Sequence, residues 1–475
     1  MRLFMIVYYY FIVLFGVLDQ VIYGWDAQPD GYEVINGPES SKSLESWRTN
    51  WTSWKTMELG SNRYSPNDLC NVYNIQGLEW TQVNFVQVFL MMNDRDIYDR
   101  EKQEYTVEKY VEKMQERIGT IDSVLLWSGY PNIGIDDRNQ WDLLRNLPGG
   151  INGVKTVIAD FHRQGIRVII PYNPWDIGTR DETGLEDMVR MYQADITTLN
   201  QVISDLEADG FNGDTMYGVP KSFYNCTKPL VATPEGGVPT AYLSNNPMSW
   251  GYFFGYSHFP PVARAKFLES RHMVQICARW SLDRRVELLT AFFNGAGYVV
   301  WENVWGIWNA MTESEDEMAK RMFAILRKFG RIVSTGLWTP YYVMKDDGLF
   351  ASAFYLQKSE ETLYTVISVV DEEMTFDLVL TDQQSINDVH VYDVYHGVEL
   401  KKQTGANSTS GLVVTVTLEP GAFGAIYVTK SSESNDDLDQ FLEKMRAMTI
   451  KPLSACSTER NLLQQQLVRS STTSK

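Results

Sequence analysis

Short apolar runs recur along the middle of the chain, and segments with helical periodicity separate them. The first three runs are Phe85–Met91, Ile121–Trp127 and Ile166–Ile170. Helical spacing of apolar residues follows the first two runs, at Tyr105–Ile118 and at Val154–Gln164. Each run is continuously apolar, which is typical of strands that are covered on both faces. This alternation predicts a parallel sheet with helices packed outside it.

The alternation continues until it accounts for eight strands. The remaining runs are Phe211–Gly213, Pro229–Thr233, Ser249–Phe254, His272–Ala278 and Tyr298–Trp301. Further helices are predicted at about Leu185–Ala208, Asp283–Phe293 and Glu315–Ile332, but none between the fifth and sixth strands. Eight strands that alternate with helices over about 250 residues are the signature of the (β/α)8 (TIM) barrel. We therefore expect an α/β fold, with the barrel at residues 81–335.

The segments on either side of the barrel differ from it in composition and in the spacing of apolar residues. Residues 336–430 contain short strands divided by turn-forming residues, which predicts an antiparallel C-terminal β-sandwich. Residues 431–475 are rich in Ser, Asn and Gln, with one possible helix at Leu438–Met448, and we expect a tail of low order. Residues 25–80 are polar and lack sustained periodicity, so we expect an N-terminal extension on the outside of the barrel.

The first 24 residues have the features of a targeting segment. A basic start, Met1-Arg2, precedes an apolar run over Leu3–Leu18, which is shorter than a spanning helix and predicts a cleaved signal peptide. A membrane anchor is the alternative. Sequons at Asn50, Asn225 and Asn407 predict N-glycosylation of a secreted protein, although such triplets also arise by chance. Cys70 and Cys226 form a possible disulfide, whereas Cys277 lies in an apolar strand and is expected to be a buried thiol.

The net charge, and the motifs that the sequence lacks, exclude several kinds of ligand and cofactor. The net charge of -18 argues against nucleic acid, and we expect no membrane contact after signal cleavage. The sequence lacks a CxxC or Cys/His pattern, a phosphate-binding loop and a Ser/His/Asp arrangement. We therefore expect no metal and no cofactor. The sequence does not define the oligomeric state.

Barrel enzymes carry their chemistry at the carboxyl ends of the strands, so we examined those positions. Carboxylates, arginines and aromatic residues dominate there, which favours a carbohydrate ligand. The candidate substrate-binding residues are Asp94, Arg95, Tyr130, Asp136, Asp137, Arg138, Trp175, Asp176, Arg279, Trp301 and Glu302. Simpler alternatives stay open: the acidic and basic residues can be loop scaffolding or salt bridges, and Trp301, Trp305 and Trp308 can form one apolar core stripe.

Two carboxylates stand out because they follow adjacent strands. Hydrolysis of a glycosidic bond needs two carboxyl groups that flank the bond, and Asp214 and Glu235 meet this need at the ends of the fourth and fifth strands. Strands about 4.8 Å apart can place the two groups near the ~5 Å separation of retaining enzymes. Asp214 is the expected nucleophile and Glu235 the expected acid/base. Glu302 is the rival acid/base, and a turn-capping role is the alternative for Asp214.

The stretch DGFNGDTM around Asp214 resembles the nucleophile strand of the alpha-amylase superfamily and related alpha-glycosidases. Glu235, on the next strand, is similar to their acid/base. The segments YPNIGIDDRNQWDLLRNLPGG, PYNPWDIGTRD and FFNGAGYVVWENVWGIWN resemble a poorly characterised group of barrel glycoside hydrolases. The resemblance covers residues 80–430 and implies a barrel, a C-terminal sandwich and glycosidase activity.

The sequence departs from amylases in two places. It lacks the Asn-His pair after the seventh strand, and the usual Arg-x-Asp has become Asn212-Gly213-Asp214. The resemblance therefore implies the barrel and the acid positions but not the detailed amylase mechanism. The sequence predicts a secreted glycoside hydrolase that cleaves an O-glycosidic bond, most simply with retention. A non-catalytic carbohydrate-binding barrel is the alternative, and a lyase or isomerase on the same scaffold is a third hypothesis.

Overall fold

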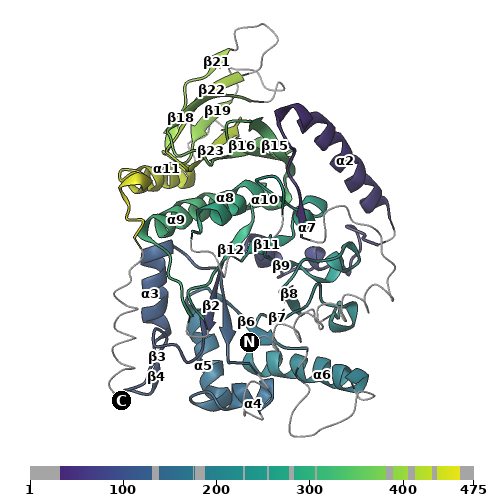
Figure 1. Cartoon of the computed structure of the whole chain (residues 1–475). Coiled ribbons are helices and arrows are strands. Elements are labelled where there is room, and N and C mark those ends of the chain that lie inside the picture. Colours follow the sequence, from purple (N-terminus) through teal and green to yellow (C-terminus); the bar gives the residue numbers. More distant parts are fainter. Residues whose placement is uncertain are drawn as a thin grey trace.

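The structure is a computed structural model. It describes residues 33–61, 63–130, 138–174, 176, 188–227, 230–253, 256–277, 283–304, 307–380, 389–404, 412–430 and 436–459. Two bodies lie one above the other in Figure 1: a helix-covered sheet in the lower part and a pair of antiparallel sheets at the top.

The lower body is the predicted barrel. Its strands are β2 (Val86–Met91), β5 (Ser123–Trp127), β6 (Arg167–Tyr172), β7 (Gly210–Gly213), β8 (Val231–Pro234), β9 (Met248–Gly251), β11 (Met273–Ile276) and β12 (Gly297–Val300). They hydrogen-bond in the order β8-β7-β6-β5-β2-β12-β11-β9, and every pair is parallel. All eight strands overlap the predicted runs, so the (β/α)8 fold is confirmed.

The barrel has a seam between its first and last strands in this order. Within the described residues, β8 and β9 lie side by side but are not joined by a backbone ladder. The chain between them forms a 3-10 helix, η6 (Thr240–Asn245), and no α-helix, as the sequence indicates. Parallel strands without a crossover α-helix lose one source of support from outside the barrel. Other groups must therefore hold this seam.

Helices cover the rest of the barrel. Those in predicted segments are α3 (Val107–Ile118), α5 (Gly150–Arg163), α6 (Met188–Leu206), α8 (Arg285–Asn294), α9 (Glu313–Lys328) and α10 (Gly330–Thr335). The short helices α4 (Gln140–Arg145) and α7 (Arg264–Leu268) were not predicted. In α3 the residues that face inward, such as Val107, Val111 and Met114, are buried, whereas the charged residues are mostly exposed. This pattern follows the periodicity of 3.6 that a barrel helix needs to bury one face.

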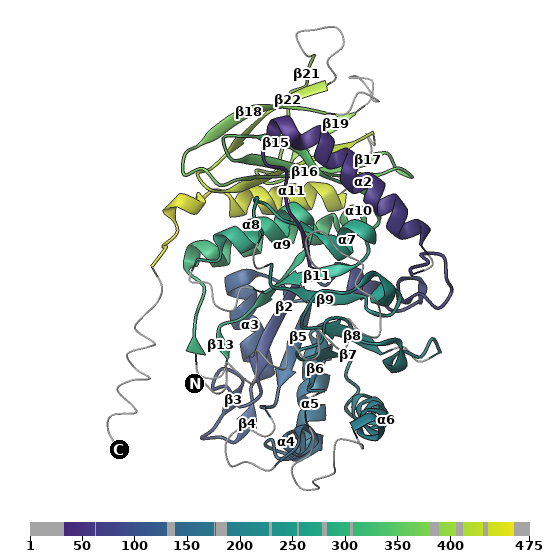
Figure 2. The ribbon, with the colours of Figure 1, turned by 45° about the vertical axis from the view of Figure 1, so that its right-hand side comes forward.

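The upper body is the predicted sandwich. One sheet has the strand order β15 (Leu337–Lys345), β16 (Leu349–Leu356), β17 (Glu361–Ser368), β23 (Phe423–Thr429), β19 (His390–Asp393) and β20 (Val398–Glu399). The other is β18 (Met374–Val379), β22 (Leu412–Leu418) and β21 (Gln403–Thr404), and all pairs in both sheets are antiparallel. Val366, Phe376 and Val414 belong to the buried core between the sheets. Figures 1 and 2 show α8, α9, α10 and α11 as a layer between the sandwich and the barrel.

The segment after the sandwich is more ordered than its composition suggests. Residues 436–459 contain α11 (Asp436–Met448) and the 3-10 helix η8 (Leu453–Ala455). Phe441, Leu442 and Met445 of α11 are buried, and both elements pack against α9. A few large apolar residues at helical spacing are enough to dock a polar segment on an existing surface. The expected low order does not hold for these residues.

The N-terminal extension also contains structure that the sequence did not predict. β1 (Val34–Ile35) pairs antiparallel with β10 (Val262–Ala263), and α2 (Leu44–Gly60) runs along the side of the molecule toward the sandwich. The Ser, Thr and Asn residues of α2 have low helix propensity, which masks the helix in the composition of the segment. Its tryptophans Trp47, Trp51 and Trp54 pack on one another and on the core.

Cysteine pairing agrees with expectation. Cys70 and Cys226 form a disulfide, which ties the extension to the segment between β7 and β8. Cys277 is a buried free thiol, as predicted. The expected signal peptide, residues 1–24, lies outside the described residues. Across the part of the chain that the structure describes, no helix is both long and apolar enough to cross a bilayer.

Candidate active site

Asp214 and Glu235 leave neighbouring strands at the same level of the barrel. Gly213 lies opposite Pro234 in the β7–β8 ladder, so the next residue of each strand is one of the two acids. The Asp214 amide donates to the Tyr172 carbonyl at 2.9 Å, and the Glu235 amide donates to the Gly213 carbonyl at 3.0 Å. The parallel ladder therefore continues through both acids. Since neighbouring strands lie ~4.8 Å apart, the structure places the backbones of the two predicted acids side by side.

The Glu235 carboxylate is fixed at both oxygens. Its Oε2 accepts a hydrogen bond from the Thr215 amide at 2.7 Å, directly after Asp214, and its Oε1 accepts one from the Tyr252 hydroxyl at 2.6 Å. Thr215 has a φ of 60°, a left-handed conformation that is unusual for a β-branched residue. Such strain is tolerated where the surrounding structure imposes it, and here it turns the Thr215 amide toward Glu235. Glu235 is therefore held against the turn that carries Asp214.

Asn173 lies on the other side of Asp214. It follows β6, whose last residue, Tyr172, lies opposite Gly213, so Asn173 and Asp214 are at the same level of adjacent strands. Asn173 is fully buried, and neither its Nδ2 nor its Oδ1 has a hydrogen-bond partner among the residues that the structure describes. An unsatisfied buried amide costs about 1–3 kcal/mol, so each such group in a native protein calls for an explanation. A sugar hydroxyl, which both donates and accepts, would satisfy it.

Aromatic side chains from β2, β5 and β9, and one directly after β12, pack on one another. The Phe89 ring lies 5.1 Å from the Trp127 ring, 6.0 Å from the Trp250 ring and 4.3 Å from the Trp301 ring. Trp301, a candidate substrate-binding residue, is only 3% exposed, so these contacts account for it as a core residue. Tyr130, another candidate, packs edge-on against Trp127 at 5.1 Å and is half-buried at the strand end.

Other predicted contact residues lie at the same edge of the barrel with structural partners. Oδ2 of Asp94 accepts a hydrogen bond from Asn303 at 2.8 Å, and burial raises the pKa of Asp94. Asp176 is buried, and its Oδ2 accepts a hydrogen bond from the Gln140 amide at 2.7 Å, so it organises the start of α4. Arg95 is exposed and Arg138 is half-buried.

Glu302 belongs to an ion-pair network. Its two carboxylate oxygens accept hydrogen bonds from Arg117 at 2.6 and 2.8 Å, and Arg117 also binds Asp316 at 2.9 and 3.0 Å. Burial acts to raise the pKa of Glu302, but the hydrogen bonds and charge of Arg117 outweigh it, so this pKa is lowered. A carboxylate held in its ionised form is a poor proton donor. The geometry therefore favours Glu235 over Glu302 as the acid/base.

Some predicted residues lie outside the described part of the chain. They are Asp136, Asp137, Trp175, Trp305, Arg279 and the sequon residue Asn407. The side chain of Trp308 is likewise not described. Asn50 and Asn225 are both exposed, and Oδ1 of Asn225 accepts hydrogen bonds from the amide and hydroxyl of Thr227. Within the described residues, no cluster of three or more His, Cys, Asp or Glu side chains is arranged to hold a metal ion.

One acidic residue near Glu235 was not predicted from the sequence. Oε1 of Glu33, directly before β1, accepts a hydrogen bond from the Gly237 amide at 3.1 Å. Burial raises the pKa of Glu33 to about 7; backbone hydrogen bonds from Gly237, Phe253 and Tyr252 act against this shift, and the charge of Glu235 adds to it. The sequence carried no signal for this placement, because Glu33 lies in a polar stretch far from any barrel strand.

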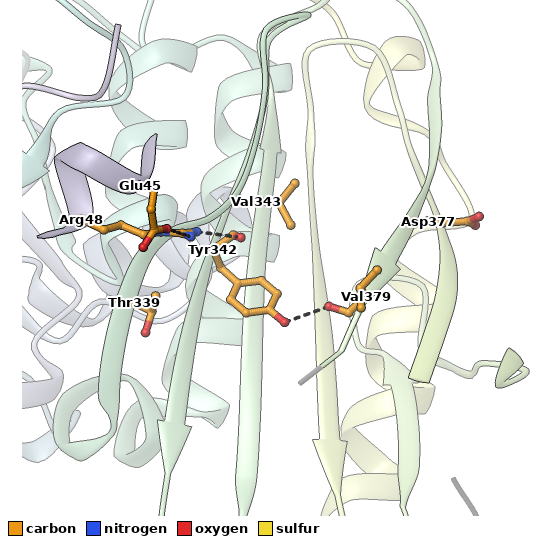
Figure 3. Close-up of a pocket in the computed structure, with 7 residues that line it drawn as sticks. All are labelled: Glu45, Arg48, Thr339, Tyr342, Val343, Asp377 and Val379. Carbon is orange, nitrogen blue, oxygen red and sulfur yellow. Dashed lines mark hydrogen bonds and ion pairs between the residues drawn. The ribbon is translucent and has the colours of Figure 1, made fainter. Parts of the chain in front are cut away.

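A pocket lies away from Asp214 and Glu235. It has a volume of about 540 Å³ and is formed by α2, β15 and β18, with Glu45, Arg48, Tyr342 and Asp377 among its lining residues (Figure 3). Arg48 donates to the Tyr342 carbonyl at 3.1 Å, and the Tyr342 hydroxyl donates to the Val379 carbonyl at 2.9 Å. These bonds join α2 to β15 and β15 to β18, so the pocket fits a junction between α2 and the sandwich better than a reaction site.

Comparison with solved structures agrees with this architecture. An alpha-amylase from Anoxybacillus superposes with a TM-score of 0.52 at 11% identity, over 74% of this chain and 99% of that chain. The chain has the fold of an alpha-amylase. Two further structures match less well. One is an alpha-amylase from Geobacillus thermoleovorans, with a TM-score of 0.48 and 13% identity over 74% of this chain and 99% of that chain. The other is a debranching enzyme from Nostoc punctiforme, with a TM-score of 0.49 and 10% identity over 74% of this chain and 99% of that chain. No protein-family model and no curated protein sequence matches.

Proposed function

We propose that the protein is a glycoside hydrolase that cleaves an O-glycosidic bond with retention of configuration. Asp214 attacks the anomeric carbon, and Glu235 donates a proton to the leaving oxygen and later activates water. The observation that carries the proposal is the ladder register, which places the two acids on adjacent strand ends at one level. An inverting enzyme would need carboxyl groups ~6.5–9.5 Å apart, with space for a water molecule.

The surroundings of the two acids suit these roles. Both side chains are buried, with 6% of Asp214 and 8% of Glu235 exposed, so charge that develops on the sugar is screened weakly by water. Asn173 offers an unsatisfied amide beside Asp214 that can bind a sugar hydroxyl. Asn212 cannot replace the arginine of amylases, because its Nδ2 donates to the Thr233 carbonyl at 2.8 Å. We infer that substrate hydroxyls are bound here differently from amylases.

We also propose that the protein enters the secretory pathway and carries N-linked glycans. The disulfide between Cys70 and Cys226 supports an oxidising compartment, since such bonds are rare in the cytosol. The exposed sequon residues Asn50 and Asn225 support glycosylation. The expected ligand is a carbohydrate alone, without a metal or cofactor, and the acidic net charge of -18 argues against nucleic acid and anionic membranes as partners.

The direct test is hydrolysis of a panel of aryl glycosides and glycans by the secreted protein beside the Asp214→Asn variant. The panel begins with alpha-linked glucans, because an alpha-amylase shares the fold. We expect one substrate class to be cleaved by the wild-type protein and not by the variant. Equal activity of the variant would remove Asp214 from the mechanism. Binding without cleavage by either protein would favour a non-catalytic carbohydrate-binding barrel.

A further inference from the structure

The seam between β8 and β9 opens next to Glu235. Glu235 follows β8, and Tyr252, which donates its hydroxyl proton to Glu235, follows β9. Within the described residues no backbone ladder joins these two strands, and the chain between them contains a 3-10 helix in place of a barrel α-helix. The separation of the two strand ends at this edge is therefore not fixed by the hydrogen bonds that hold the other strands.

Glu33 reaches this seam from outside the barrel. Its backbone is anchored by the adjacent β1–β10 pair, in which Val34 lies opposite Ala263, and the Arg264 amide donates to the Glu33 carbonyl at 3.0 Å. Its carboxylate accepts the Gly237 amide at 3.1 Å, two residues after Glu235. The main-chain amides of Tyr252 and Phe253, directly after β9, act to lower the pKa of this carboxylate. Glu33 thus bonds to the segment after β8 through its carboxylate and to a segment after β9 through its carbonyl.

From this geometry we propose that Glu33 is a positioning residue that closes the β8–β9 seam and holds Glu235 and Tyr252 in place beside Asp214. The inference rests on the proposed function of the Asp214 and Glu235 pair. It makes the N-terminal extension part of the active site. A carboxyl group suits this position, since one oxygen holds the Gly237 amide while the other stays able to accept a further hydrogen bond.

The kinetic test compares Glu33→Gln with Glu39→Gln, an exposed acid of the same segment. We expect Glu33→Gln to lower kcat about tenfold at pH 7 with little change in KM, because Glu33 does not contact the sugar. Glu39→Gln should match the wild type. A Glu33→Gln variant with the kcat of the wild type would overturn the inference.

Crystal structures of the variants test the same inference without activity. In Glu33→Gln the amide oxygen can still accept the Gly237 amide, but the amide nitrogen cannot accept a hydrogen bond. We expect Tyr252 and Phe253 to shift and the bond between Tyr252 and Glu235 to be lost. Unmoved residues 235–237 and 252–253 would contradict the positioning role. If the wild-type protein cleaves no glycoside, the proposed function fails, whereas these structures still decide whether Glu33 holds the seam.

Discussion

At the scale of residues, surroundings separate acids that look equivalent in sequence. Glu235 and Glu302 both follow a barrel strand directly or within two residues, but Glu302 is bound through both oxygens by Arg117. Glu235 is bound instead by a main-chain amide and a tyrosine hydroxyl. The sequence indicated both candidates, and only the position of Arg117, 185 residues away in the chain, distinguishes them.

Glu235→Gln tests the acid/base assignment. We expect kcat/KM to fall by about 10²–10⁴-fold on a natural glycoside, the usual contribution of general acid catalysis. The loss should be smaller on an aryl glycoside with an acidic phenol, because that leaving group needs little protonation. Steady-state rates on the two substrates give the comparison, and Glu39→Gln is the matched control. An equal loss on both substrates would argue against a role in protonating the leaving group.

The Arg117 network predicts a pH dependence of stability. Burial, aided by the charge of Glu302, raises the pKa of Asp316 from 3.8 to about 6 despite the opposing Arg117. The folded protein therefore binds more protons than the unfolded chain between about pH 4 and pH 6, and stability falls as the pH rises through this range. A pKa difference of this size between the folded and unfolded protein corresponds to about 3 kcal/mol of unfolding free energy.

The variant Asp316→Asn should remove this decrease in stability with rising pH. Above about pH 4.5 the lowered pKa of Glu302 no longer changes the unfolding free energy as the pH rises. A difference between variant and wild type that changes from about pH 4.5 to about pH 7 is therefore due to Asp316. We expect the Tm of the variant, relative to wild type, to increase with pH across this range. Thermal unfolding followed by circular dichroism at each pH measures the difference. A difference that is constant with pH would show that Asp316 has an ordinary pKa.

At the scale of elements, the strands and helices with a clear pattern of apolar residues are the ones that the sequence predicted. The eight strands were identified from continuous apolar runs, and α3 and α5 from apolar spacing, because burial on a parallel sheet imposes those patterns. α2 was missed because its polar residues mask three tryptophans at helical spacing, and the pairing of β1 with β10 joins segments more than 220 residues apart. Glu33 was missed for the same reason, because local sequence does not encode a contact with Gly237, 204 residues away.

The disulfide links two such distant elements. Cys70 and Cys226 are separated by 156 residues, and a cross-link that closes so long a loop restricts the unfolded chain strongly. The double variant Cys70→Ser, Cys226→Ser should lose about 2–5 kcal/mol of unfolding free energy. Urea unfolding measures the loss. Each single serine variant also lacks the disulfide and should show a similar loss, whereas an unchanged midpoint in the double variant would contradict a stabilising role.

At the scale of the whole molecule, the sandwich and the candidate site lie at opposite ends of the barrel. The elements that follow β2 and β5, namely β3 (Tyr98–Asp99), β4 (Glu104–Tyr105) and α4, lie away from the sandwich in Figures 1 and 2. Helices α8 and α10 pack against β16 and β17 on the other side. Within the described residues, the sandwich therefore supports the barrel and does not supply residues to the acid pair. On the proposed function, carbohydrate would reach Asp214 and Glu235 from the edge that faces away from the sandwich.

The anomeric configuration of the first product tests the central claim most directly. Proton NMR during the first minutes of hydrolysis, on the best substrate from the glycoside panel, distinguishes the two anomers before they equilibrate. Because Asp214 and Glu235 leave adjacent strands at one level, we predict a product with the configuration of the substrate. A first product of inverted configuration would contradict the pairing of Asp214 as nucleophile with Glu235 as acid/base.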